Sequence, residues 1–223
     1  MALSAKVFRL DEELPQEIIF DKLRNYRVVD EVEGVRLERF FKDVVRVGSY
    51  IRGTYVFDEP IEMDVAGDVR LLPRRRYAEV AFTDYGGSSY LIILEKKFRA
   101  NRIALELSEI LFISRGKILE AYTSHEILKS LHESSPESTR VIYFDNVDIP
   151  NIKKLALYGE ALADTELYSE YLRHGLIWYV VFEHRETGYV VGLTRNMIVV
   201  LFSKSTSDEF IDFIIRHIIP LVR

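Results

Sequence analysis

Apolar and polar residues alternate along much of the 223-residue chain, and a few segments instead repeat apolar residues every three or four positions. Alternation is typical of strands that bury one face, whereas the wider spacing is typical of amphipathic helices. The predicted strands cover residues 6–10, 26–69, 77–82, 90–94, 117–122, 141–144, 176–182, 189–193 and 197–202. The segment 26–69 is predicted to bend at the glycines within it. The predicted helices cover residues 14–23, 99–112, 124–133, 150–157 and 207–219.

Local signals mark several of these boundaries. Pro15 and Pro150 suit the first turn of a helix, and Ser124 suits a helix N-cap. Gly86 and Gly87 in TDYGGSS supply the paired glycines that a tight hairpin turn favours.

The chain reads as two related halves. The stretch YLIILEKKFRANRIALELSEIL matches VVLFSKSTSDEFIDFIIRHII at a constant shift, which pairs Leu94 with Leu201 and Leu107 with Ile214. We therefore predict an α+β fold of two related halves, each with a strand, a helix, antiparallel strands and a long helix, with the helices packed on one face of the sheet. The predicted division is a first half at 1–115 with an inserted β-rich segment at about 26–76, a strand-helix connector at 116–138, and a second half at 139–223.

Two stretches of the second half, VIYFDNVDIPNIKKLAL and GYVVGLTRNMIVVLFSKSTSDEFIDFIIRHII, follow the order strand, helix, hairpin, tight turn, strand and long helix. In this order they resemble one repeat of the TATA-box-binding protein fold. The resemblance covers about residues 139–219 and, loosely, 6–112. It implies a saddle-shaped sheet that opens the DNA minor groove with wedged phenylalanines. In this chain the wedge positions of the second half fall near Gly175 and Gly192, and glycine cannot unstack a base step.

Composition narrows the class of protein. With no cysteine, the chain forms no disulfide, no thiolate metal site and no cysteine nucleophile. Its apolar runs are far shorter than the roughly 18 residues of a membrane span, and residues 1–10 lack a signal-peptide stretch, so we expect a soluble, cytoplasmic protein without membrane contact. Charged residues at 29% and a single glutamine, Gln16, are typical of a thermophile. The net charge of −5 argues against a surface coated with positive charge for nucleic acid.

A dense basic cluster, Arg74, Arg75 and Arg76 with Arg70 nearby, lies toward the hairpin end of the first half. Adjacent guanidinium groups on an exposed loop would grip phosphates or the carboxylates of a partner through paired hydrogen bonds. Alternatively, the run is a solvated turn that guards an edge strand.

A second basic cluster, Lys96, Lys97, Arg99 and Arg102, lies at the start of the helix predicted for residues 99–112. Cations are unfavourable at a helix N-terminus because the helix dipole is positive there. The cluster therefore predicts either an anion bound at this helix end or the pairing of these cations with acidic residues elsewhere in the fold.

Three aromatic residues, Trp178, Tyr179 and Phe182, lie on one predicted strand, where side chains alternate between two faces. One set then faces away from the helices, where it is available to stack on bases or to contact another protein. A dimer or domain interface is the alternative use of the same residues.

No motif indicates a metal, a cofactor or a catalytic nucleophile. The five histidines show no ligand spacing, and GxSxG, GxGxxG and GxxxxGK are absent at strand ends. Asp148, which follows a strand, suits a helix cap better than a magnesium site. We therefore predict no cofactor and no metal.

These patterns together predict a non-enzymatic binding protein, a nucleic-acid-associated or transcription-related factor of a thermophilic archaeon. The first alternative is a protein-interaction module or homodimer that binds no nucleic acid. The second alternative is an enzyme of unknown class whose site carries no short motif.

Overall fold

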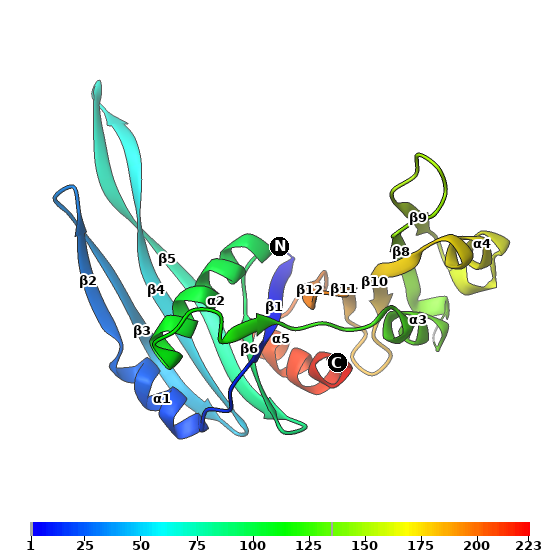
Figure 1. Cartoon of the computed structure of the whole chain (residues 1–223), viewed down its shortest axis with the longest axis horizontal. Coiled ribbons are helices and arrows are strands. Elements are labelled where there is room, and N and C mark those ends of the chain that lie inside the picture. Colours follow the sequence, from blue (N-terminus) through cyan, green and yellow to red (C-terminus); the bar gives the residue numbers. More distant parts are fainter. Residues whose placement is uncertain (1, 135) are drawn as a thin grey trace. The chain divides into compact units, whose positions relative to one another are not determined.

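A computed structural model describes residues 2–134 and 136–223, so Ser135 in the predicted connector lies outside the described residues. The chain divides into two compact units, which we call unit 1 (Met1–Val7 and Glu120–Arg223) and unit 2 (Phe8–Leu119). Strand β1 (Leu3–Leu10) contributes residues to both units. Figure 1 traces the elements of both units in chain order.

Strands hold 45% of the chain and helices 29%. Unit 2 contains α1 (Gln16–Asn25), β2 (Arg27–Val32), β3 (Val35–Val47), β4 (Tyr50–Val65), β5 (Asp68–Tyr85), β6 (Ser88–Ile93) and α2 (Lys97–Phe112). Strand β7 (Ile118–Glu120) leads into unit 1, which contains α3 (His125–Glu133), β8 (Thr139–Asp145), β9 (Leu155–Tyr158), α4 (Glu166–His174), β10 (Leu176–Glu183), β11 (Val190–Thr194), β12 (Ile198–Leu201) and α5 (Ser207–Phe213). Helix α5 continues as a π-helical turn (Ile214–Ile218) and a 3-10 turn (Ile219–Leu221).

The predicted fold class, two related α+β halves with helices packed on one face in the layout of the TATA-box-binding protein, is wrong. Hydrogen bonds connect the strands in the antiparallel order β2-β3-β4-β5-β6-β1-β12-β11-β10-β8-β9, with β7 beside β1. The two halves are also unequal, because α2 has 16 residues and α5 only 7, and because β9 occupies part of the segment predicted as a helix. The described chain is therefore dominated by sheet, with five short α-helices.

The segment after Pro150 is extended instead of helical. Residues 155–158 pair with β8, with Leu157 opposite Ile142 and Tyr158 opposite Val141. Leu157 is buried and its neighbours on both sides are not, which is the alternation of an edge strand. Pairing with β8, and not the proline before it, sets the structure of this segment.

Other local predictions are confirmed. The side chain of Ser124 accepts a hydrogen bond from the Ile127 backbone and caps α3. Gly86 and Gly87, with φ of 58° and 79°, form the turn between β5 and β6. Strands β10 and β11 pair as the second predicted hairpin. Helix α4, which the sequence pattern does not predict, begins at a Thr165 cap.

Strands β4 and β5 form one long hairpin in unit 2. It turns at Ala66 and Gly67, whose φ angles of 58° and 92° place both in the left-handed region. Strand β3 pairs with β4 only as far as Phe57, and β6 pairs with β5 only as far as Val80. The distal part of the hairpin is therefore a two-stranded ribbon, visible beyond the ends of the neighbouring strands in Figure 1.

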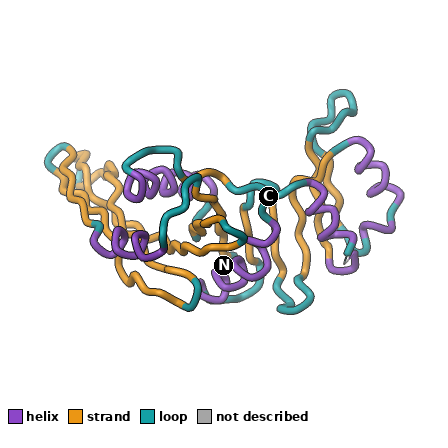
Figure 2. Tube along the Cα trace, turned by 60° about the horizontal axis from the view of Figure 1, so that its bottom comes forward, coloured by secondary structure: helices purple, strands orange, loops and turns teal. Residues whose placement is uncertain are grey.

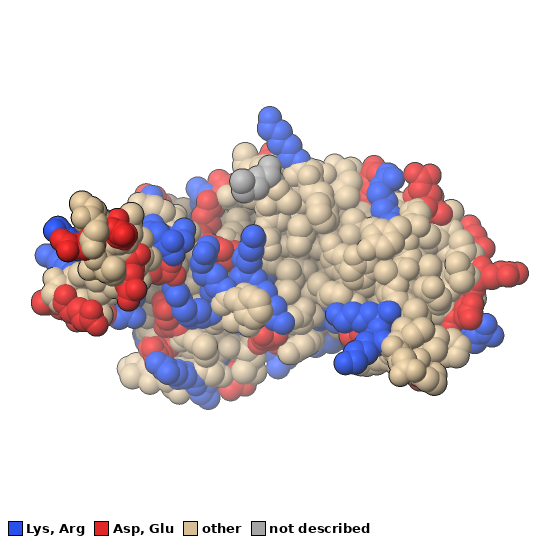
Figure 3. All heavy atoms as spheres, turned by 90° about the horizontal axis from the view of Figure 1, so that it is seen from above, with Lys and Arg blue, Asp and Glu red and all other residues tan. Residues whose placement is uncertain are grey.

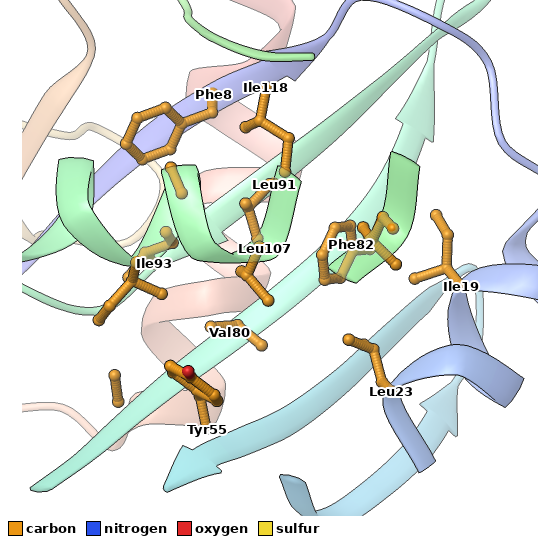
Figure 4. Close-up of a cluster of buried hydrophobic side chains, with 14 of the residues drawn as sticks. Phe8, Ile19, Leu23, Tyr55, Val80, Phe82, Leu91, Ile93, Leu107 and Ile118 are labelled. Carbon is orange, nitrogen blue, oxygen red and sulfur yellow. The ribbon is translucent and has the colours of Figure 1, made fainter. Parts of the chain in front are cut away.

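Unit 2 has a hydrophobic core to which α1 and α2 contribute. Ile19 and Leu23 of α1 and Leu107 of α2 belong to one buried cluster with residues of β1, β4, β5 and β6 (Figure 4). Within this cluster, the Tyr55 hydroxyl donates a hydrogen bond of 2.7 Å to the Glu106 carboxylate. Burial, followed by the charge of Glu106, raises the pKa of Tyr55. In Figure 2 the strands of each unit run side by side, with helices beside them.

Candidate functional site

The predicted arginine run lies on strand β5 and not on a loop. Arg75 is opposite Asp58 of β4, and its Nε donates a hydrogen bond of 2.9 Å to the Asp58 carboxylate. Its guanidinium also lies 3.3 Å from the Glu38 carboxylate. Hydrogen bonding by Arg75 is the largest cause that lowers the pKa of Asp58. The charge of Arg75 is therefore already matched by carboxylates of the same sheet.

Members of both predicted basic clusters meet at one carboxylate. Arg74 and Arg76 of β5 and Arg102 of α2 lie 3.2, 3.2 and 2.7 Å from the carboxylate oxygens of Glu59. The pKa of Glu59 is lowered, because these hydrogen bonds outweigh the opposing effect of burial. Arg70 is separate from this group, near the tip of the hairpin, where it lies 3.8 Å from Asp68. The convergence joins the hairpin to α2.

The predicted basic cluster lies at the start of α2, but only some of its residues are paired with carboxylates. Arg99 pairs with Glu95 at 2.8 Å. Lys96 and Lys97 are exposed, and within residues 2–134 and 136–223 neither side chain has an ion pair. Phe98 beside them is 86% exposed.

In unit 1, the short helices α3 and α4 pack beside one face of the sheet at strand β8. Phe144 of β8 contacts the rings of Tyr168 and Tyr171 in α4, and Tyr168 in turn contacts His132 of α3. Phe182 points to this same covered face and is only 4% exposed. Phe182 is therefore a core residue, and the structure separates it from Trp178 and Tyr179.

The opposite face of this sheet, which we call the open face, carries two uncharged rows of residues across the strands. The first row is Ala156, Tyr143, Tyr179 and Thr194, on β9, β8, β10 and β11. The second row is Tyr158, Val141, Val181, Gly192, Val200 and Ser4, on β9, β8, β10, β11, β12 and β1. Neither row contains a charged residue. The register places Lys6 beside them on this face, opposite Ile198, where Lys6 is fully buried and ion-paired with Glu120 at 2.7 Å.

Four aromatic rings form a cluster at the β8–β10 end of the open face. The Tyr143 ring centroid lies 5.8 Å from that of Tyr158, 5.8 Å from that of Trp178 and 5.4 Å from that of Tyr179. A register irregularity between Ile177 and Tyr179 brings Trp178 into this group. The Tyr143 and Tyr158 hydroxyls hydrogen-bond to each other, which is the largest cause that raises the pKa of Tyr158.

Sequence reasoning found Trp178 and Tyr179 but missed Tyr143 and Tyr158. The signal was present in the period-two alternation of VIYFD and LALY. Tyr158 is the most exposed member of the cluster, at 66%. It was hidden because LALY lay at the end of a predicted helix.

Gly192 makes room for the Tyr179 ring. A Cβ atom at Gly192 would lie 2.9 Å from Cε2 and Cζ of Tyr179 and closer still to its hydroxyl. Real side chains essentially never approach so closely, so Tyr179 lies flat on β11 only because residue 192 is glycine. Gly192, which the resemblance to the TATA-box-binding protein places at a DNA-wedging position, therefore has a packing role.

Charged residues surround the open face and are matched to one another. Arg140 lies 3.2 Å from Glu183 and 3.4 Å from Glu160, and Arg195 hydrogen-bonds to Asp145. Over the strands of unit 1, on the right of Figure 3, most of the visible surface is uncharged, and charged residues gather toward its margins.

Trp178 has two further features. The Lys154 ammonium lies 4.5 Å from the centre of its ring, in cation–π contact. Its indole Nε1 is buried without a hydrogen-bond partner. Trp178 thus marks the boundary between the aromatic cluster and its charged margin.

No family model matches the sequence, and no curated protein matches it. Among residues 2–134 and 136–223, no group of three or more histidine, aspartate or glutamate side chains is arranged to hold a metal ion. Over the same described part of the chain, no helix has the length and apolar character needed to cross a membrane.

Proposed function

We propose that the chain is a non-enzymatic protein-interaction module and that the open face of unit 1 holds the partner polypeptide. The observation that carries the proposal is the pair of uncharged cross-strand rows with four aromatic rings at one end. Protein interfaces are enriched in tyrosine and tryptophan, are depleted of charge at their centres, and have polar rims. The open face has this same distribution.

Electrostatics supports a protein partner over nucleic acid. Surfaces that stack single-stranded nucleic acid combine aromatic rings with cations that follow the phosphates. Here Arg140 and Arg195 are paired with carboxylates, and Lys154 lies on the Trp178 ring. The arginine run of β5 is likewise paired with Asp58 and Glu59. With a net charge of −5, the chain adds no general attraction for phosphates.

The size of the open face suits a protein contact. Its rows cross up to six strands, each about 4.8 Å wide, and with flanking positions extend roughly 17 Å along them, which gives a footprint on the order of 500 Å². Val181 and Thr194 within this footprint are only 8% and 7% exposed, so the exposed apolar surface is smaller than the footprint. Exposed apolar patches of about 300–600 Å² on a single chain are often functional. Phe202, which continues the alternation of β12, is 50% exposed and adds apolar surface.

The residue usage supports a cytoplasmic protein of a thermophilic archaeon, and we propose that setting for the interaction. Ion-pair networks such as the one around Glu59 gain importance at high temperature, because the cost of desolvating charges falls as temperature rises.

The proposal is tested by selecting peptides from a random library displayed on phage against the immobilised chain. Tyr158→Asp serves as the variant, because Tyr158 is exposed and the substitution places a charge in the cluster. Leu167→Asp serves as the matched control, because Leu167 is an exposed apolar residue of α4, 52% exposed. We expect apolar, aromatic-rich peptides to be enriched by the wild-type chain and the control but not by Tyr158→Asp.

Equal enrichment by all three proteins, or none by any, would overturn the proposal. Fluorescent single-stranded and duplex oligonucleotides at low salt form the parallel arm of the experiment. Binding of these probes with a steep salt dependence, and loss of binding in Tyr158→Asp, would instead favour the nucleic-acid class that the sequence also predicts.

A further inference from the structure

The side chains of the open face are bulky at one end, which we call the high end, and small at the other, which we call the low end. The high end, on β8, β9 and β10, carries the bulky rings of Tyr143, Tyr158 and Trp178. Within the two rows, the low end, on β11 and β12, carries Thr194 and Val200, which are much smaller, and the larger Phe202 lies beyond the rows where β12 ends. A partner that packs well on this face must therefore have the opposite relief, low where the rings stand and high over the small residues.

The chain itself has that opposite relief. A twofold axis parallel to the strands, in the plane between two stacked copies and over the gap between β10 and β11, places β8 of one copy over β12 of the other and β10 over β11. In a pair of copies related in this way, the aromatic end of each copy lies over the small-residue end of the other. Twofold contacts are self-complementary by construction, because residue i of one copy meets residue j of the other and the reverse.

We propose that the occupant of the open face is a second copy of this chain, packed sheet on sheet about that twofold axis. This inference rests on the proposed function, because it names the partner of the same surface. Stacked sheets lie about 10 Å apart and interdigitate their facing side chains, which the alternation of high and low ends allows here.

Charge and area agree with a reversible dimer. Two of the charged positions at the margins, Arg140 beside Glu183 and Arg195 beside Asp145, carry opposite charges side by side, so at these positions two copies meet without facing like charges. Two faces on the order of 500 Å² bury about 1,000 Å² in total, the lower limit for a specific interface. We therefore expect a dissociation constant that is roughly micromolar and not nanomolar.

Sedimentation equilibrium over a concentration series tests the dimer. The wild-type chain and Leu167→Asp are expected to associate as monomer and dimer with the same constant. Tyr158→Asp is expected to weaken the association at least roughly tenfold, because it buries a charge between two apolar faces. A dimer that Tyr158→Asp leaves unchanged would overturn the proposed interface, and a wild-type chain that stays monomeric would overturn the dimer itself.

A cysteine cross-link tests the arrangement of the two copies, since the chain has no cysteine of its own. Val141 lies on β8 and Val200 on β12, three strand spacings apart in one chain, or roughly 14 Å, which is too far for a disulfide within one copy. In the proposed dimer, Val141 of one copy faces β12 of the other. A mixture of Val141→Cys and Val200→Cys chains should form cross-linked dimers with a short bismaleimide, because stacked sheets lie about 10 Å apart, beyond the reach of a direct disulfide, whereas each variant alone should form few.

Equal cross-linking in the mixture and in the separate variants would contradict the twofold arrangement. The sedimentation and peptide-selection experiments together distinguish failure of the dimer from failure of the proposed function. A monomeric wild-type chain that still enriches peptides in a manner dependent on Tyr158 overturns only the dimer. A monomeric chain that enriches none overturns both.

Discussion

Replacing Gly192 by alanine removes the space on which the Tyr179 ring lies. The added Cβ would come within 2.9 Å of ring atoms Cε2 and Cζ, so the ring must turn off β11. Tyr179 is partly buried, and uncovering about 100 Å² of its ring costs about 2.5 kcal/mol at about 25 cal/mol per Å². Alanine lowers the entropy of the unfolded chain and returns about 0.5 kcal/mol. The net loss of unfolding free energy is therefore about 2 kcal/mol.

Urea unfolding of a double-mutant cycle measures this effect. Gly192→Ala should cost about 2 kcal/mol in the wild-type chain and close to nothing in the Tyr179→Ala background, where no ring remains to be displaced. The expected coupling between the two positions is thus about 2 kcal/mol. Equal costs of Gly192→Ala in both backgrounds would refute the placement of Tyr179 on β11.

Three further predictions concern stability. His132 is fully buried without a hydrogen-bond partner, and burial lowers its pKa, so the unfolded chain binds more protons below about pH 6.5. Unfolding free energy should therefore fall by up to about 1.4 kcal/mol per pH unit below pH 6.5 on account of this residue, until the pH reaches its lowered folded-state pKa. Burial also lowers the pKa values of His125 and His184, so His132→Phe should reduce the total slope without abolishing it. An unchanged slope in urea unfolding at graded pH would contradict the assignment. Glu59→Gln leaves the guanidinium groups of Arg74, Arg76 and Arg102 without their shared carboxylate. It should lower the free energy of unfolding by about 1–2 kcal/mol at low salt and by less at high salt, whereas the control Glu62→Gln on the same strand should lower it little. Equal losses of unfolding free energy in the two variants would count against the network. Thermal unfolding of the wild-type chain should have a midpoint above the roughly 45–65 °C of mesophilic domains, and calorimetry showing a midpoint within that range would argue against a thermophilic source.

Local structure was predictable where short-range chemistry decides it. Ser124 caps α3 through a hydrogen bond to a residue three positions away, and the Gly86-Gly87 turn needs only its own backbone angles. The helix predicted after Pro150 fails for the opposite reason. Leu157 becomes a strand residue through its pairing with Ile142, and that contact is not visible in the local pattern.

The candidate site was predictable only in part, because its residues meet through strand register. Arg74 and Arg75 find Glu59 and Asp58 across a hairpin whose register no short motif specifies. The charge density of the run was readable from the sequence, but its neutralisation was not. In the same way, Trp178 could be read as a surface aromatic, whereas its neighbour Tyr143 comes from a strand that only the folded sheet places beside it.

Trp178 offers the most direct measurement on the open face, because it is the only tryptophan of the chain and lies in the aromatic cluster. The peptide most enriched in the phage selection is titrated into the wild-type chain while tryptophan emission and its quenching by acrylamide are followed, with a peptide that lacks tryptophan. If the open face is the interaction surface, binding should shift the emission and reduce quenching at a saturable concentration, and Tyr158→Asp should abolish both changes. Saturable binding that leaves the emission and quenching of Trp178 unchanged would contradict the account.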